Sequence, residues 1–169
     1  RFVFFFFFFQ SKTPANAQPY SLDIKIGQMI IFGFYGTRVD KTGAVYKAVK
    51  DGKVGNILLY RRNISAMNTS SQLQKLIKDF QSAAPISLFI SIDQEGGLVN
   101  RFDSLPGFPS MPSAFFLGNK NDIETTKYCS DNIAYTLSRL GINLNYAPVL
   151  DVYNPNCPVL GARNRCFAA

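Results

Sequence analysis

Short apolar segments alternate with helix-forming patterns four times along this chain, and this alternation restricts the possible folds more than any other feature. Each apolar segment is rich in aliphatic and aromatic residues and is bounded by turn residues, which is the pattern of a strand. The predicted buried strands are 28–34, 54–60, 88–92 and 144–151. The helices predicted from the spacing of apolar residues are 22–27, 41–50, 70–81 and 122–140. Such alternation indicates an α/β fold with a parallel sheet and right-handed crossovers.

The ends of these elements also carry local signals. Ser70 or Ser71 can act as the N-cap of the helix over 70–81. Gly141 is predicted to end the helix over 122–140 as its C-cap. Because Pro148 cannot donate a hydrogen bond within a sheet, we expect a bulge or a strand end near it.

Unusual polar residues follow the predicted strands. They are Arg61 to Asn63, Asp93 to Arg101, and Asp151 onward. In a (β/α)8 barrel the loops at the carboxyl ends of the strands build the site, so this distribution favours that fold. An open doubly wound sheet would bind ligands at the same ends, but the chain lacks a Gly-x-Gly-x-x-Gly or Walker phosphate loop.

The segment 87–102 concentrates the chemistry. Its apolar strand leads directly into Asp93, Glu95, two glycines and Arg101. A carboxylate at the end of a buried strand needs partners or a ligand to offset its desolvation, and paired glycines let the backbone approach what binds there. Taken by itself, the same pattern also fits a turn with solvated charges.

Composition excludes several classes of function. The chain carries a net charge of +7, but its Lys and Arg residues are scattered and lack the aromatic interleaving of a nucleic-acid groove, so we expect no nucleic-acid partner. It contains no His, which removes His-based metal sites and catalytic triads. Cys129, Cys157 and Cys166 are too widely spaced for a zinc site, and we expect free thiols, with a Cys157–Cys166 bridge as the alternative in an oxidising compartment.

The N-terminus has the plan of a secretory signal peptide. Arg1 precedes an apolar run from Phe4 to Phe9, and the triplet 15–17 offers a small-residue cleavage site after Ala17. The run is too short for a stable membrane span, and its alternative is a buried strand. We therefore separate a candidate signal peptide, 1–17, from a domain over 18–169 and expect an exported protein, periplasmic or secreted. Without a functional signal the protein would be cytoplasmic.

Taken together, the strand blocks of the chain resemble the N-terminal barrel domain of glycoside hydrolase family 3, in its β-N-acetylhexosaminidase branch. The matching blocks stand in the family's order and at similar spacing, and Asp93-Gln94-Glu95-Gly96-Gly97 is the most specific of them. The blocks are 54–63, 92–102, 141–152 and 160–163.

The resemblance implies a role for individual residues. The aspartate at the position of Asp93 accepts hydrogen bonds from sugar hydroxyls, and arginines at the positions of Arg101 and Arg163 hold the sugar. A carboxylate and fixed guanidinium donors suit hydroxyl and acetamido groups. The resemblance thus implies a glycosidase of the β-N-acetylhexosaminidase type. Its substrate would be an amino-sugar or cell-wall-derived oligosaccharide, and it would need no metal or organic cofactor.

The chain also departs from the family pattern. Leu98 stands where the family has Arg, and Asn164-Arg165 stands where it has Ser followed by Phe or Tyr. The family's His-rich loop, its Asp/His acid–base pair and its nucleophilic aspartate find no counterpart here. Asp93 and Glu95 are an unfavourable substitute, because a retaining pair must stand on either side of the glycosidic bond.

We therefore expect the first half of a barrel, about four βα units, that is inactive alone. The resemblance implies that the catalytic groups of the family lie beyond Ala169, so we expect no catalytic residue within the chain itself. A half barrel leaves two sheet edges and part of its core uncovered, which predicts instability or aggregation. The alternative functions are a non-catalytic sugar-binding envelope protein and, ranked lower among enzymes, a β-glucosidase.

Overall fold

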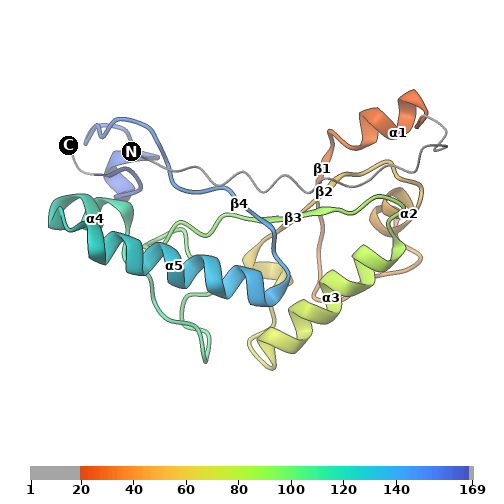
Figure 1. The fold of residues 1–169 in the computed structure, drawn as a ribbon, viewed down its shortest axis with the longest axis horizontal. Helices are drawn as coiled ribbons and strands as arrows, with labels where there is room; N and C mark the ends of the chain where they lie inside the picture. The colour runs from red at the N-terminus through yellow and green to blue at the C-terminus, as the bar shows by residue number, and fades with distance from the viewer. Residues whose placement is uncertain (1–19, 168–169) are drawn as a thin grey trace.

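The computed structural model describes residues 20–167, which form a parallel four-stranded sheet flanked by helices (Figure 1). The strands are β1 (Ile31–Gly33), β2 (Asn56–Leu59), β3 (Phe89–Ile92) and β4 (Leu144–Asn145). The helices are α1 (Leu22–Gly27), α2 (Ala44–Lys50), α3 (Thr69–Ala83), α4 (Ala114–Lys120) and α5 (Ile123–Leu140), with 3-10 turns η1 (Arg61–Asn63) and η2 (Gly161–Arg163).

Two predictions concern the ends of the chain. The predicted signal peptide, 1–17, lies outside the described residues. Ala169, beyond which the catalytic groups of the family are expected, also lies outside them. Both therefore stay predictions from the sequence.

The sheet has the order β1-β2-β3-β4, and every neighbouring pair is parallel. The predicted alternation of strands and helices, and the parallel sheet that follows from it, are therefore confirmed. Parallel neighbours that follow one another along the chain bring all their carboxyl ends to one edge of the sheet. The polar segments after the strands consequently meet at that edge.

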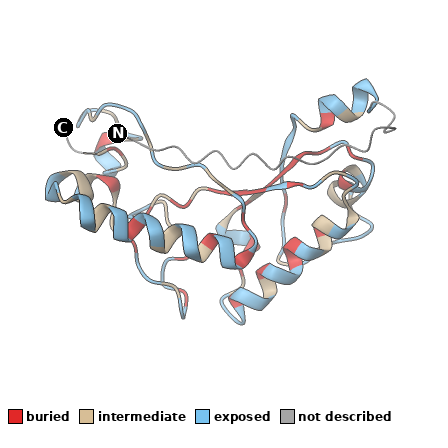
Figure 2. Cartoon of the chain, viewed as in Figure 1, coloured by how far each residue is buried: buried red, intermediate tan, exposed pale blue. Residues whose placement is uncertain are grey.

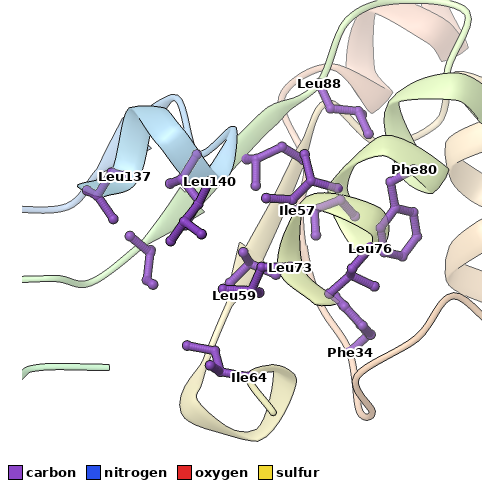
Figure 3. Close-up of a cluster of buried hydrophobic side chains, with 14 of the residues drawn as sticks. Phe34, Ile57, Leu59, Ile64, Leu73, Leu76, Phe80, Leu88, Leu137 and Leu140 are labelled. Carbon is purple, nitrogen blue, oxygen red and sulfur yellow. The ribbon is translucent and has the colours of Figure 1, made fainter. Parts of the chain in front are cut away.

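The core lies between the sheet and the helices of one face. Ile57 and Leu59 lie two positions apart on β2, so both side chains point to the same face of the sheet. There they pack in one cluster with Leu73 and Leu76 from the apolar face of α3 (Figure 3). Figure 2 shows this burial on β2 and β3 and on the sheet-facing sides of α3 and α5, whose outer sides are exposed. The helical pattern predicted for 70–81 thus provides the largest contribution to the core.

The opposite face of the sheet carries a polar row. The Ser91 hydroxyl donates to Asn56 Oδ1 at 2.6 Å, and the Asn56 amide donates to the Tyr146 hydroxyl at 2.9 Å. Ser91 and Asn56 are both buried, and a buried polar side chain without a hydrogen-bond partner would destabilise the fold. These hydrogen bonds provide the partners. This row links β2 and β3 to the segment that follows β4.

The first strand is not buried, and that prediction was wrong. Ile31 and Phe32 expose 49% and 41% of their surface. The reason is topological: β1 is at the edge of the sheet and pairs only with β2 among the described residues. An apolar run identifies a strand but does not tell which of its faces will be covered.

The element ends differ from the sequence prediction in two places. Helix α3 begins at Thr69 with Asn68 as its N-cap, so neither Ser70 nor Ser71 caps it. Helix α4 is not among the helices predicted from the sequence, and it is capped by the Ser113 hydroxyl, which accepts from Phe116 N at 3.3 Å.

Two other predicted ends agree with the structure. The buried strand predicted over 144–151 is wrong in extent and burial, since β4 covers only Leu144–Asn145 and both residues are half-buried. The strand end expected near Pro148 is confirmed, because β4 ends before this proline. Gly141 ends α5 with a positive φ of 86°, which confirms the predicted C-cap.

The three cysteines are free thiols, as expected. Cys129 and Cys166 are buried like small apolar side chains, whereas Cys157 is only partly buried. Across residues 20–167 no helix combines the length and apolar character needed to cross a membrane.

Candidate functional site

The turn after β3 is built around two glycines with positive φ, 91° at Gly96 and 56° at Gly97. Glu95 N donates to Val99 O at 2.9 Å, which closes the turn, and Gly97 N donates to Met111 O at 2.8 Å. A Cβ on Gly96 would overlap the backbone oxygen of Pro112. The absence of a side chain at both glycines therefore lets this turn pack closely against the segment before α4, which is a structural reason for the two glycines.

Asp93 stands at the carboxyl end of β3 and forms an ion pair with Arg101, with 2.8 Å between Asp93 Oδ2 and Arg101 Nη2. Both side chains are partly exposed, so a ligand can reach them. The Arg101 Nε group is buried and has no hydrogen-bond partner among the described residues. The two residues predicted from the sequence are thus brought together, with donor and acceptor capacity left over.

Gln94, which the sequence reasoning missed, holds this pair in place. Its side chain accepts from Arg101 N at 2.8 Å and donates to Asn100 Oδ1 at 2.8 Å. Its backbone exchanges two hydrogen bonds with the Asn145 side chain, at 2.9 and 3.0 Å, and so ties β3 to β4. A buried glutamine between two acidic residues was the available signal, because a polar side chain on a buried strand end needs partners.

Glu95 is occupied by Arg165 rather than free for chemistry. Arg165 Nη2 and Nε donate to the two carboxylate oxygens of Glu95 at 2.6 and 3.0 Å, in a bidentate pair. The hydrogen bonds that the Arg165 guanidinium donates to Glu95 raise the pKa of this guanidinium, and desolvation opposes this effect. The departure at Asn164-Arg165 from the family pattern therefore supplies a partner for the turn after β3.

Arg163 lies in η2 with an exposed side chain. No hydrogen bond or ion pair joins its guanidinium to Asp93 or Arg101 in the part of the chain that the structure describes. The structure thus brings together two of the three residues predicted from the sequence and places the third two positions from Arg165, in the same segment.

The residues after β2 divide into two roles. Asn63 is fully buried and structural, since its amide donates to Phe34 O at 3.0 Å and Gly36 O at 2.9 Å. Arg62 is exposed, and its guanidinium lies 4.2 Å from the centre of the Tyr60 ring. The Arg101 guanidinium approaches the same ring at 5.8 Å, so Arg62 and Arg101 share one aromatic platform.

A groove of about 710 Å³ lies beside this site, between α5 and the segments that flank it. Gln94 and Glu95 line one end of it, and the rest is mostly apolar, with Leu117, Ile133 and Leu137 among its lining. No cluster of His, Cys, Asp or Glu suited to a metal ion occurs within residues 20–167. The arrangement offers carboxylate acceptors and guanidinium donors, which is chemistry for holding a polyhydroxylated ligand.

Proteins of similar sequence are named as glycosidases. A β-hexosaminidase of Neisseria meningitidis serogroup C is 34% identical over 121 residues, covering 68% of this chain and 32% of that protein. A secreted glycosyl hydrolase of Arthroderma benhamiae is 28% identical over 164 residues, covering 93% of this chain and 44% of that protein. The chain thus spans about a third of the length of the β-hexosaminidase and under half of the secreted hydrolase.

Solved structures of glycosidases share the fold. A family 3 β-N-acetylglucosaminidase from Paenibacillus sp. FPU-7 has a TM-score of 0.77 at 35% identity, over 86% of this chain and 27% of that chain. A β-N-acetylhexosaminidase from Beutenbergia cavernae has a TM-score of 0.72 at 28% identity, over 89% of this chain and 46% of that chain. Residues 21–167 also match the glycosyl hydrolase family 3 N-terminal domain. The sheet, the turn after β3 and these similarities lead to one conclusion: the chain belongs to glycoside hydrolase family 3.

Proposed function

We propose that this chain binds a terminal β-linked N-acetylhexosamine residue of an amino-sugar oligosaccharide, as the substrate-binding part of a glycoside hydrolase. The observation that carries the proposal is the partly exposed Asp93–Arg101 pair at the carboxyl end of β3. A sugar hydroxyl donates to the carboxylate, while the guanidinium donates to a hydroxyl or acetamido oxygen. The names of the relatives, β-hexosaminidase and β-N-acetylglucosaminidase, favour an amino sugar over glucose.

Two further arginines stand near this pair in the proposal. Arg163 is exposed in η2 and free to turn toward a bound sugar, as the family resemblance implies. Arg165 is held by Glu95 and acts by fixing the segment that carries Arg163. Arg163 is therefore the proposed ligand contact, and Arg165 the positioning residue.

We further propose that the chain alone binds the sugar without cleaving the glycosidic bond. Hydrolysis with retention needs a nucleophile and a proton donor on opposite sides of that bond. Asp93 and Glu95 follow the same strand, and each is engaged by an arginine, which leaves neither free to give a proton to the leaving oxygen. The chain has no His to take that role. In this proposal the bond-breaking groups come from outside the chain, from residues that would follow Ala169.

Binding of N-acetylglucosamine, followed by ligand-observed NMR, tests the first part. We expect saturation-transfer signals with the chain and a loss of affinity of about tenfold or more for Asp93→Asn, because one charge-assisted hydrogen bond contributes roughly 1.5–3 kcal/mol. The matched control is Asp103→Asn, since Asp103 is an exposed carboxylate of the same loop and accepts a hydrogen bond from the adjacent Ser104 hydroxyl. Equal affinity of wild type and Asp93→Asn would refute the proposed site.

Release of a chromophore from an aryl N-acetylglucosaminide tests the second part. We expect no release above background from the chain alone. Turnover that disappears in both Asp93→Asn and Glu95→Gln would instead make these two carboxylates the catalytic pair. The predicted signal peptide makes export part of the proposal, and one relative is named as secreted.

A further inference from the structure

Tyr35 exposes 86% of its surface, yet the loop that carries it is held firmly. Arg62 Nε donates to Phe34 O at 3.0 Å, and the Asn63 amide donates to the carbonyls on both sides of Tyr35, at Phe34 and Gly36. Asn63 is itself fully buried, so these contacts are protected from solvent. A large aromatic ring is therefore displayed to water by a loop that has little freedom to move.

One face of the Tyr35 ring is covered and the other is open. The Arg62 guanidinium lies 4.5 Å from the centre of the Tyr35 ring and 4.2 Å from the centre of the Tyr60 ring, so it contacts both tyrosines. Gly33 makes room for this stack, since a Cβ there would lie 3.2 Å from the Tyr60 ring and 3.5 Å from Arg62 Nη2. The covered face orients Tyr35, and its high exposure shows that the other face is available.

The stack leads from the proposed sugar site to Tyr35. The guanidinium of Arg101, which pairs with Asp93, lies 5.8 Å from the centre of the Tyr60 ring. The Arg62 guanidinium contacts both the Tyr60 ring and the Tyr35 ring. These residues follow β1, β2 and β3, whose carboxyl ends are neighbours in the sheet. Three aromatic–guanidinium contacts thus connect Tyr35 to Arg101 of the proposed sugar site.

We propose that the open face of Tyr35 stacks against the second sugar ring of a bound amino-sugar oligosaccharide. This inference rests on the proposed function, in which Asp93 and Arg101 hold the terminal ring. The C–H face of a pyranose is apolar, and an aromatic side chain gives it a large contact area while the phenol hydroxyl stays in water. Because the loop is already ordered, little conformational entropy is lost on binding. Tyr35 makes the site prefer a disaccharide to a monosaccharide.

The test compares N-acetylglucosamine with N,N′-diacetylchitobiose by NMR titration of the chain. We expect the disaccharide to bind more tightly to wild type, and Tyr35→Ala to weaken the disaccharide about three- to tenfold while leaving the monosaccharide unchanged. Tyr35→Phe keeps the ring and should bind both sugars like wild type. Tyr128→Ala is the matched control, because Tyr128 is an exposed tyrosine on α5.

The outcomes separate the two proposals. If wild type binds neither sugar, the proposed function fails and the stacking proposal falls with it. If wild type binds both sugars and Tyr35→Ala weakens both equally, or neither, the sugar site stands and the stacking role of Tyr35 is overturned. Wild-type spectra of Tyr35→Ala outside the loop 34–36 would show that the variant is folded in either case.

Discussion

Glu95 and Arg165 are joined by two hydrogen bonds, of 2.6 and 3.0 Å, although 70 residues separate them in the chain. The Glu95 side chain is only 8% exposed, so its charge depends on this partner. The pair ties the turn after β3 to the segment that follows β4. Within that segment an isolated bridge pairs Val149 with Cys166, the neighbour of Arg165. The glutamate of the most specific family block is therefore a structural residue in this chain.

Arg165→Ala should destabilise the chain by about 3 kcal/mol, because it leaves a buried carboxylate without a partner. The double variant Glu95→Gln/Arg165→Gln should lose less than the sum of its single variants, since neither residue is then left charged and alone. Urea unfolding followed by circular dichroism gives these values. Strict additivity in the cycle would mean that the pair contributes no coupling energy.

Arg163→Ala should have the opposite profile. Its side chain is exposed, so we expect a change in stability of less than about 0.5 kcal/mol. Affinity for N-acetylglucosamine should fall several-fold, as expected for a lost hydrogen bond to a charged donor. The same NMR titration measures this, with Arg139→Ala on α5 as a control for an exposed arginine. Unchanged affinity would remove Arg163 from the proposed site.

Gly96→Ala should be among the most destabilising changes in the turn after β3. The new methyl group would overlap the Pro112 backbone oxygen, and the φ of 91° is unfavourable for any side chain. Gly107→Ala is the matched control, because Gly107 has a similar φ of 83° with open space around it. We expect about 1 kcal/mol for Gly107→Ala and at least about 3 kcal/mol for Gly96→Ala, by urea unfolding. Equal losses would show that the close approach to Pro112 is relieved at little cost.

The parts of the fold that sequence could predict are those where one local pattern has one structural meaning. The spacing of Leu73, Leu76 and Phe80 permits only a helix with one apolar face, and that face is buried in the structure. Gly141 at the end of a helical pattern is a C-cap for conformational reasons. Asp93 and Arg101 were each named as site residues through the family resemblance of the block 92–102, whereas the ion pair between them was not predicted.

The rest depended on contacts between distant segments. Glu95 meets Arg165, and Gln94 meets Asn145, only after the chain has folded, and no local pattern encodes either partner. The same limit applies to Ile31, whose apolar character predicted burial while its exposure depends on where β1 falls in the sheet. Local sequence thus predicts elements well, whereas pairing across the sheet needs the structure.

Asp122 makes the stability of α5 depend on pH. Hydrogen bonds from the Thr125 hydroxyl, and from the backbone N–H groups of Thr125 and Glu124, lower the pKa of this N-cap carboxyl in the folded chain. The unfolded chain therefore takes up the proton first, and the stabilisation is present above the ordinary pKa of Asp, about 3.9, and is lost as pH falls below it.

Urea midpoints from pH 7 down to about pH 2.5 check this behaviour. The difference between wild type and Asp122→Ala should be largest above about pH 5 and should shrink at the acid end. Asp122→Asn keeps a neutral cap, so its difference from Asp122→Ala should stay constant over the same range. A difference between wild type and Asp122→Ala that does not change with pH would contradict the role of the charge.

Within residues 20–167 the outer edge of β1 has no partner strand, and this edge should make the chain associate with itself. Ile31 and Phe89 flank Asn56 in one register row, and they expose 49% and 57% of their surface. Unpaired backbone groups beside exposed apolar side chains are a template for pairing with another strand. We therefore expect concentration-dependent oligomers in sedimentation velocity.

Ile31→Lys should shift the chain toward monomer, because a lysine on an edge strand opposes pairing. Tyr128→Lys, on the exposed side of α5, should leave the association unchanged. A wild-type chain that stays monomeric and melts cooperatively would show that the edge is tolerated and that the predicted instability of the half barrel is wrong.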